Sequence, residues 1–136
     1  MLLDRARDLM KDAKIGYLAT VEGDQPRVRA MSVRLTDDGR ILTATGKESQ
    51  KIGQAMENPK AEFCFVNAKW DQVRADGRLK IIEDQADKNW FWSAEPAVKD
   101  YFANSSDPNY VLLEFIPSEV ELFEAKSGEF HRRQKV

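Results

Sequence analysis

The chain has 136 residues, a length that fits one domain with a single sizeable core. Its formal net charge of −2 and pI near 5.5 argue against binding to nucleic acid mainly through bulk positive charge, so we expect no nucleic-acid partner. The one cysteine, Cys64, excludes an intrachain disulfide framework and a cysteine-rich metal site. Because no apolar run could span a membrane and the N-terminus has no apolar signal core, we expect a cytoplasmic protein without a membrane partner.

The first third of the chain is typical of a helix followed by an antiparallel meander. Apolar residues recur at helical spacing over 2–13, with charged residues between them. The β-rich segment 15–21 ends at the turn sequence EGDQP, which predicts a strand and a hairpin turn. Two more strands are expected over 27–35 and 40–45, separated by the turn sequence TDDG at 36–39.

The middle of the chain predicts one short helix and two strands. Ser49 suits the N-cap of a helix, which Asn58-Pro59 would end because a residue before proline disfavours the α conformation. Strands are expected over 60–66 and 72–82. In the second of these, apolar and polar residues alternate cleanly, which indicates one buried and one solvated face.

The last part of the chain combines helices, strands and a polar tail. The aromatic segment 85–103 predicts two short helices divided at Pro96. Strands are expected over 110–116 and 119–124, with a turn at Pro117-Ser118, and the basic tail over 126–136 is expected to be disordered or bound to a partner. The whole pattern predicts a single domain over 1–136 that is mainly β, an antiparallel β-barrel or sandwich with flanking α-helices.

Cations and small hydroxyl side chains gather between residues 26 and 51: Arg29, Arg34, Lys47, Lys51, Ser32, Thr43, Thr45 and Ser49. Ser49 and the amides after it stand at a helix N-terminus, whose N–H groups and dipole suit a phosphate. Lys51 could add a charged hydrogen bond, and Thr45 a hydroxyl. A capped surface helix with solvated lysines and arginines is the alternative. Arg29 and Arg34 are five residues apart, so a regular strand would point them to opposite faces.

The remaining chemistry-bearing residues give no catalytic assignment. The sequence has no hydrolase elbow, Walker loop, dinucleotide fingerprint or zinc-ligand spacing. We interpret His131, the only histidine, as a solvated tail residue and Cys64 as a buried core thiol. The three tryptophans are interpreted as core or interface anchors. We therefore expect no metal site and assign no catalytic residue.

A set of short motifs in a fixed order resembles the pyridoxamine 5′-phosphate oxidase-like family of FMN-binding split barrels. The motifs are Pro26-Arg27-Val28-Arg29, Arg34, Gly39, Thr45, Glu48-Ser49-Gln50-Lys51, Asn58-Pro59, the run from Gln72 to Gly77, and Ile116-Pro117. The resemblance covers about residues 1–125. It implies an antiparallel split barrel of the FMN-binding type that forms a homodimer, with FMN in a groove between the subunits.

The resemblance also implies roles for particular residues. The flavin would be lined by Arg29, Ala30, Met31 and Ser32, with Arg34 as a nearby cation. The phosphate would be held by Thr45, Ser49, Gln50 and Lys51. Gln72 would touch the isoalloxazine ring or lie across the dimer interface.

The function implied is that of an FMN-dependent oxidoreductase. The flavin would pass a hydride or electrons from reduced nicotinamide to a small-molecule substrate, which agrees with the lack of a visible nucleophile or acid–base pair. Gln50 stands where the true oxidase has a second basic residue, and that enzyme's longer C-terminal motif is absent. We therefore expect the short branch that includes general stress proteins, not a true pyridoxamine 5′-phosphate oxidase. The alternatives are a non-catalytic flavin carrier, or a relative that binds deazaflavin or haem, with His131 as the axial ligand of the haem.

Overall fold

The computed structural model describes residues 2–136, without the side chains of residues 132 and 133. In chain order the elements are α1 (Leu2–Ala13), β1 (Ile15–Glu22), β2 (Gln25–Leu35), β3 (Ile41–Gly46), α2 (Gln50–Glu57), β4 (Lys60–Val66), β5 (Gln72–Ile82), α3 (Gln85–Ala94), the 3-10 helix η1 (Pro96–Asp100), β6 (Tyr110–Glu124) and β7 (Glu129–Lys135). The predicted helix over 2–13, the meander, the short second helix and the strands over 60–66 and 72–82 are confirmed.

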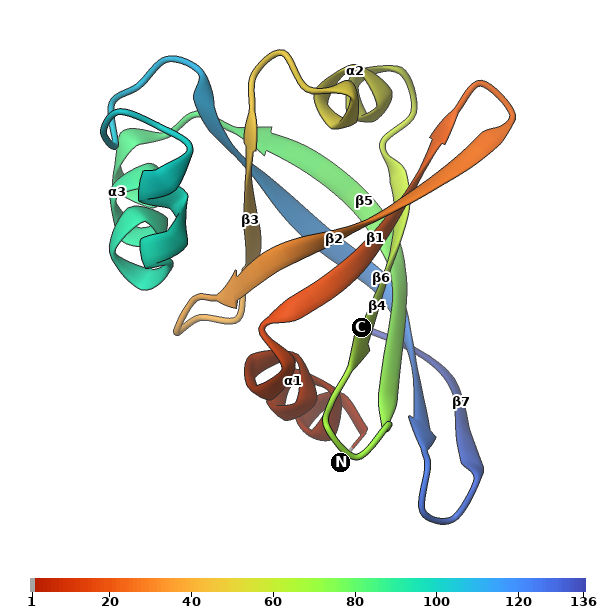
Figure 1. The fold of residues 1–136 in the computed structure, drawn as a ribbon. Coiled ribbons are helices and arrows are strands. Elements are labelled where there is room, and N and C mark those ends of the chain that lie inside the picture. The colour runs from red at the N-terminus through yellow and green to blue at the C-terminus, as the bar shows by residue number, and fades with distance from the viewer. Residues whose placement is uncertain (1) are drawn as a thin grey trace.

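The strands form one antiparallel barrel, as Figure 1 shows. Their order is β3-β2-β1-β4-β5-β6-β7, and a further pairing of β3 with β6 closes the first six into a ring. β7 pairs only with β6, outside that ring. The predicted fold class, a mainly β antiparallel split barrel with flanking helices, is confirmed.

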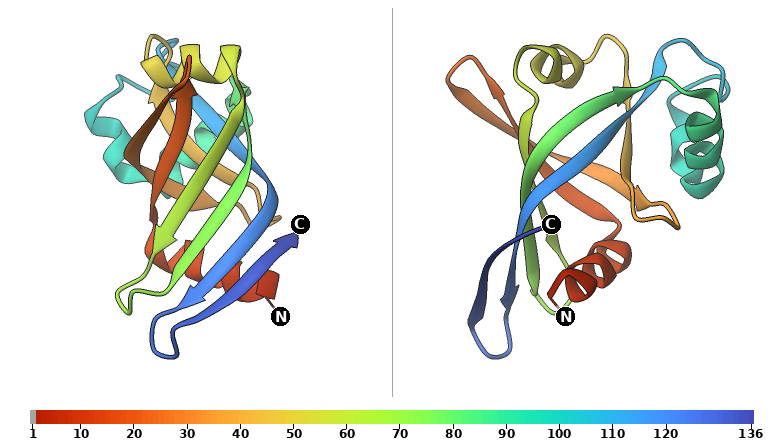
Figure 2. Two further views of the ribbon diagram at one scale, coloured as in Figure 1. Left: turned by 90° about the vertical axis from the view of Figure 1, so that its right-hand side faces the viewer. Right: turned by 180° about the vertical axis from the view of Figure 1, so that it is seen from behind.

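The barrel interior holds the main core. Because strand side chains alternate, every second residue points inward, including Leu18, Phe63, Phe65, Val73 and Phe115, all of which are fully buried. The ring of Phe63 lies 5.3 Å from that of Phe65 and 5.1 Å from that of Phe115, centroid to centroid. In Figure 2, α1 closes one end of the barrel and α2 lies over the other.

A second apolar cluster lies outside the barrel wall. Leu42 and Leu112 point outward from β3 and β6, and Phe91 of α3 and Val98 of η1 pack on them. Arg40 then bonds Asp87 of α3 at 2.7 Å and Glu114 of β6 at 2.8 Å. This packing fixes α3 and η1 beside β3, which positions one wall of the candidate site.

The prediction of two strands joined by a turn at Pro117-Ser118 is wrong. The strands expected over 110–116 and 119–124 are one continuous strand, and Pro117-Ser118 is not a turn. The reason is a register shift in the β5–β6 pairing: Asp76 lies opposite Glu119 and Gly77 opposite Pro117, so Ser118 of β6 is an extra, bulged residue. A bulge tolerates Pro117, which cannot donate a ladder hydrogen bond. Its partner Gly77 has no side chain that would crowd the distorted strand.

The prediction for the polar tail is also wrong. Residues 126–136 were expected to be disordered or partner-bound, whereas Glu129–Lys135 forms β7 after a turn in which Gly128 has a φ of 72°. The strand pairs with β6 from Glu119 to Glu124. Among residues 2–136, no helix is long and apolar enough to cross a membrane.

Candidate functional site

A surface groove of about 410 Å³ separates the outer face of β2 and β3 from η1 and the residues after it. We call it the β2–η1 groove. Its sheet side is formed by Ala30, Met31, Ser32, Ala44, Thr45 and Gly46, its end by Lys51 of α2, and its helical wall by Glu95, Ala97, Val98, Tyr101 and Phe102. Five of the residues proposed from the sequence therefore meet here: Ala30, Met31, Ser32, Thr45 and Lys51.

One end of the groove carries the hydroxyl and amine groups expected to hold a phosphate. Thr45 is buried, and its Oγ1 donates a hydrogen bond to Oγ of Ser49 at 2.9 Å. Ser49 is the N-cap of α2, as predicted, but its side chain makes no capping hydrogen bond. A helix start leaves its first N–H groups without intrahelical partners, so this corner offers donors to an anion.

Lys51 is the cation of this corner. Its side chain is half-buried, and burial, followed by the positive charge of Arg29, holds its pKa below the ordinary value. Within residues 2–136, no carboxylate forms an ion pair with the Lys51 ammonium. An anionic group entering the groove would therefore be the partner that this ammonium lacks. Lys47 differs, because it is exposed and its Nζ lies 3.6 Å from Glu83.

Arg29 points away from the groove, into the end of the barrel under α2. Its guanidinium donates to Oγ1 of Thr20 at 2.7 Å and to Oε1 of Gln54 at 2.8 Å. Thr20 and Gln54 are buried and bond each other, and burial lowers the pKa of Arg29. In this chain Arg29 thus ties α2 to β1 and adds positive charge behind Lys51, rather than lining the groove.

Arg34 lies at the opposite wall. Its guanidinium forms an ion pair with Glu95, and its Nε donates to the carbonyl of Ala94 at 3.3 Å. The expectation that Arg29 and Arg34 point to different sides is confirmed, because one contacts α2 and the other contacts the end of α3. The Arg34–Glu95 pair fastens the helical wall of the groove to β2.

Glu95 is a groove residue that the sequence analysis missed. It is only 7% exposed and lies between α3 and η1. Its position before Pro96 was a usable signal for the end of α3, since a residue before proline disfavours the α conformation. The helical wall also carries two aromatic residues, Tyr101 and Phe102. Tyr101 is 78% exposed, and the Phe102 ring lies 5.1 Å from that of Tyr110, centroid to centroid.

Four residues singled out from the sequence lie outside the groove. Gln50 is exposed at the start of α2 and does not line the groove. Gln72 begins β5, paired with Val66 and Phe123, away from the groove of its own chain. His131 lies on β7, so this chain's only histidine is not placed to ligate a haem in the groove. Cys64 is half-buried rather than buried, and burial raises its thiol pKa.

The geometry defines an antiparallel split barrel with a phosphate-suited groove on its outer wall. The family model described as pyridoxamine 5′-phosphate oxidase matches residues 2–124, and the chain belongs to this family. The family assignment made from the short motifs is thereby confirmed.

Individual relatives agree with this assignment. General stress protein 26 of Bacillus subtilis is 30% identical over 125 residues, covering 87% of this chain and 85% of that protein. The crystal structure of General Stress Protein 26 from Bacillus anthracis is 28% identical, with a TM-score of 0.81 over 97% of this chain and 99% of that one. A pyridoxamine 5′-phosphate oxidase-related, FMN binding protein from Nostoc punctiforme shares the fold, with 21% identity and a TM-score of 0.72 over 98% of this chain and 92% of that one.

Proposed function

We propose that this protein binds FMN in the β2–η1 groove and uses it as an oxidoreductase. The observation that carries the proposal is the half-buried Lys51 ammonium, which has no anionic partner among the described residues and stands beside Thr45 and the start of α2. This corner suits a phosphate ester, because a charged hydrogen bond, a hydroxyl and helix N–H groups converge there. The family assignment supports the same choice, since its description names an oxidase and one relative of the same fold is described as FMN binding.

The rest of the groove suits a flat ring system. Its floor along β2 carries the small side chains of Ala30 and Ser32, so a planar ligand can lie close to the strand. Tyr101 and Phe102 supply aromatic surface on the other wall. A volume of about 410 Å³ lies within the range of about 300–1,000 Å³ that is usual for small-molecule sites.

The residues of this chain would bind and orient the cofactor, and bound FMN would supply the redox chemistry. Lys51 would neutralise the phosphate, while Thr45 and Ser49 would offer hydroxyls to it. The Arg34–Glu95 pair would hold the helical wall against the ring and keep water out. Reduced nicotinamide is the proposed electron donor and a small molecule the proposed acceptor.

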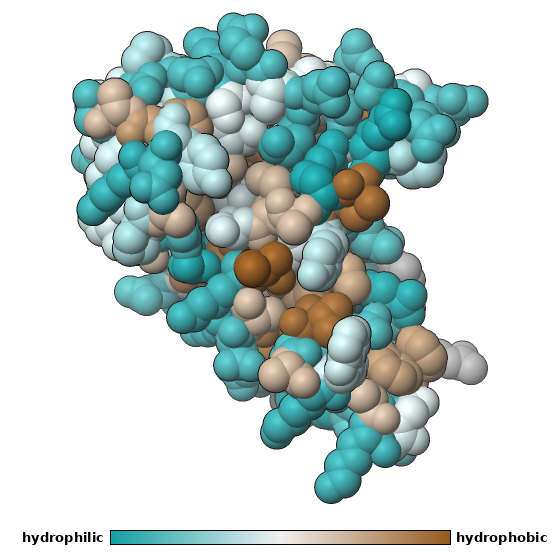
Figure 3. Space-filling model, in the orientation of Figure 1, coloured by the Kyte–Doolittle hydropathy of each residue, from teal (hydrophilic) through white to brown (hydrophobic). Residues whose placement is uncertain are grey.

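A second copy of the chain is the proposed cover for the open side of the groove. Tyr17 and Val28 are 46% and 71% exposed on the outer face of β1 and β2, and Tyr17 pairs with the groove residue Ala30. Figure 3 shows apolar side chains across the middle of this face. Burying such a surface favours association. In a homodimer Gln72 would approach the partner's flavin, as the family resemblance implies, and the free thiol of Cys64 agrees with a cytoplasmic location.

Two measurements test the proposal. The purified protein, mixed with FMN and passed through a desalting column, should retain the flavin absorption spectrum; a colourless protein would contradict FMN binding. Anaerobic addition of NADH or NADPH should then bleach the bound flavin. Retention of colour without bleaching would favour the flavin-carrier alternative, and retention of a deazaflavin instead of FMN would favour the deazaflavin alternative.

A further inference from the structure

We propose that Glu124, Glu129 and His131 form a binding site for a divalent transition-metal cation of the zinc class. The site lies on the β6–β7 hairpin, and Figures 1 and 2 place this hairpin and α2 at opposite ends of the molecule. It is therefore separate from the β2–η1 groove and does not depend on the FMN proposal.

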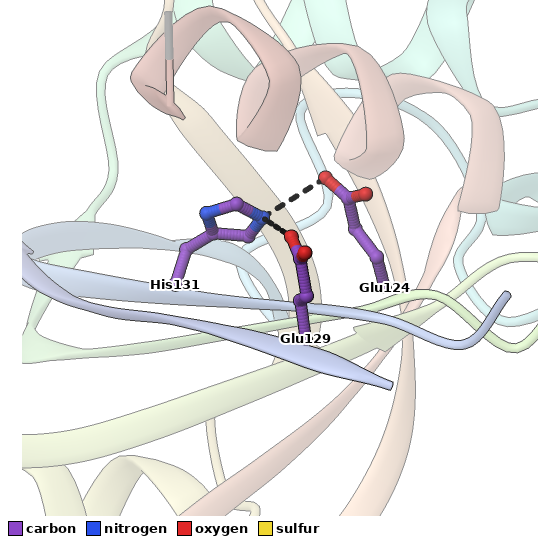
Figure 4. Close-up of side chains that lie close together, drawn as sticks. All are labelled: Glu124, Glu129 and His131. Carbon is purple, nitrogen blue, oxygen red and sulfur yellow. Dashed lines mark hydrogen bonds and ion pairs between the residues drawn. The ribbon is translucent and has the colours of Figure 1, made fainter. Parts of the chain in front are cut away.

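The backbone brings the three side chains together. Glu124 at the end of β6 and Glu129 at the start of β7 are direct cross-strand partners. His131 follows Glu129 by two residues, so both project from the same side of β7. Figure 4 shows one nitrogen of the imidazole facing both carboxylates, which come from different strands. The register of the β6–β7 hairpin alone places the three side chains together, without any movement of a loop.

The distances fit a shared cation. Nε2 of His131 lies 3.1 Å from Oε1 of Glu124 and 3.8 Å from Oε2 of Glu129. One ligand atom from each residue falls within 4.8 Å of the other two. Zinc bonds of about 2.1 Å in a tetrahedral site put neighbouring ligand atoms about 3.4 Å apart. Small side-chain rotations would therefore seat a metal ion among the three atoms.

Charge favours a cation at this position. Two carboxylates directly opposite each other on paired strands repel and destabilise the hairpin unless a positive group lies between them. The adjoining cavity, about 500 Å³ in volume, is bordered by Glu124 and by further carboxylates, Asp8 and Asp12 of α1. Arg5, Lys69 and Lys126 also border it, so the surroundings are mixed in charge and not simply acidic.

Arg5 is the competitor built into the site. Its guanidinium forms an ion pair with the same Oε1 atom of Glu124 that faces His131. A metal ion must displace Arg5 from that atom or use the second oxygen of Glu124. Removing Arg5 should therefore strengthen metal binding, a result that a purely structural ion pair would not give.

The donor set selects the class of metal. One imidazole nitrogen with two carboxylate oxygens suits Zn²⁺ and neighbouring first-row divalent ions, whereas Mg²⁺ and Ca²⁺ prefer oxygen ligands alone. Three protein ligands leave a fourth tetrahedral position for water.

The test is calorimetric titration of ZnCl₂ into the full chain, without an affinity tag and after treatment with chelator. We expect one Zn²⁺ per chain and little heat from MgCl₂. Glu129→Gln and His131→Gln should each weaken Zn²⁺ binding about tenfold or more, whereas Arg5→Gln should strengthen it. Glu83→Gln, which changes an exposed carboxylate outside the cluster, should leave it unchanged.

A thermal unfolding series with each variant separates binding from folding, because a metal that binds the native state raises the Tm as its concentration rises. The Tm of the wild type should rise with Zn²⁺, and that of His131→Gln should not. Absence of Zn²⁺ binding to the wild type, or equal binding by wild type and both ligand variants, would overturn the site. FMN retention tests the groove separately, so the two proposals can fail independently.

Discussion

The positive charge of Arg29 lies behind Lys51 and, after burial, is the second cause that lowers the pKa of the Lys51 ammonium. Arg29 itself is held by Thr20 and Gln54, so it cannot turn toward the groove without breaking those bonds. The chain therefore keeps two cations close together, one fixed inside the barrel and one at the groove. A dianionic phosphate would offset the repulsion from Arg29 and so stabilise the charged form of Lys51.

Lys51→Ala should weaken FMN binding by about 1–3 kcal/mol, the scale of one charge-assisted contact, which raises the Kd about five- to 150-fold. Quenching of FMN fluorescence measures the Kd. Lys47→Ala is the matched control, because this neighbouring lysine is exposed and faces Glu83. Equal affinities for wild type and Lys51→Ala would show that the phosphate lies elsewhere.

FMN affinity should fall with rising pH earlier than an ordinary lysine would allow. Only the ammonium form attracts the phosphate, and the pKa of Lys51 in the free protein is lowered, so its charge is lost at a lower pH. Binding is then strongest between the second phosphate pKa, about 6, and the lowered lysine pKa. Lys51→Arg keeps its charge throughout and should abolish the alkaline loss. The same alkaline decline in both proteins would assign the titration to another group.

Glu95→Gln should lower the free energy of unfolding by about 2 kcal/mol. The carboxylate is nearly buried, and its loss leaves the Arg34 guanidinium without its charged partner in a partly buried wall. Urea unfolding measures the change, with the exposed Glu83→Gln as a control that should move by less than about 0.5 kcal/mol. If both variants unfold alike, the Arg34–Glu95 pair does not hold the wall.

Two glycine variants should change stability in opposite directions. A Cβ at Gly77 would lie 2.2 Å from the carbonyl oxygen of Ile116, a backbone atom that cannot move aside, so Gly77→Ala should cost at least about 2 kcal/mol. A Cβ at Gly53 in α2 meets nothing within 4 Å, so Gly53→Ala should stabilise by about 0.5–1 kcal/mol. Thermal or urea unfolding of both variants checks the signs. A tolerated Gly77→Ala would remove our explanation of the β6 bulge beside Pro117.

Much of the fold could be predicted from local signals. Alternation and turn sequences predicted β1 to β5 because most of those strands alternate between buried and more exposed residues and lie next to turn residues. The turn expected at Pro117 was wrong because the bulge that accommodates this proline depends on Gly77, forty residues earlier (117 minus 77). β7 was missed because its polar residues carry no hydrophobic period; its pairing with β6 creates the strand.

In the candidate site, too, local signals could be predicted from the sequence and tertiary contacts could not. Thr45, Ser49 and Lys51 could be found because a strand end and a helix start lie next to each other in the chain. Glu95 and the inward orientation of Arg29 could not, since each depends on a partner brought near by the barrel: Arg34 for one and Gln54 for the other. Sequence spacing identified which groups suit a phosphate, and tertiary contacts decided which of them line the groove.

The central claim is that the β2–η1 groove holds FMN through Lys51. Equilibrium dialysis of the purified full chain against FMN tests it most directly. We expect about one FMN bound per chain for the wild type and a marked loss for Lys51→Ala at the same FMN concentration. Equal FMN concentrations on the two sides of the membrane for the wild type, or saturation that Lys51→Ala leaves unchanged, would contradict the claim.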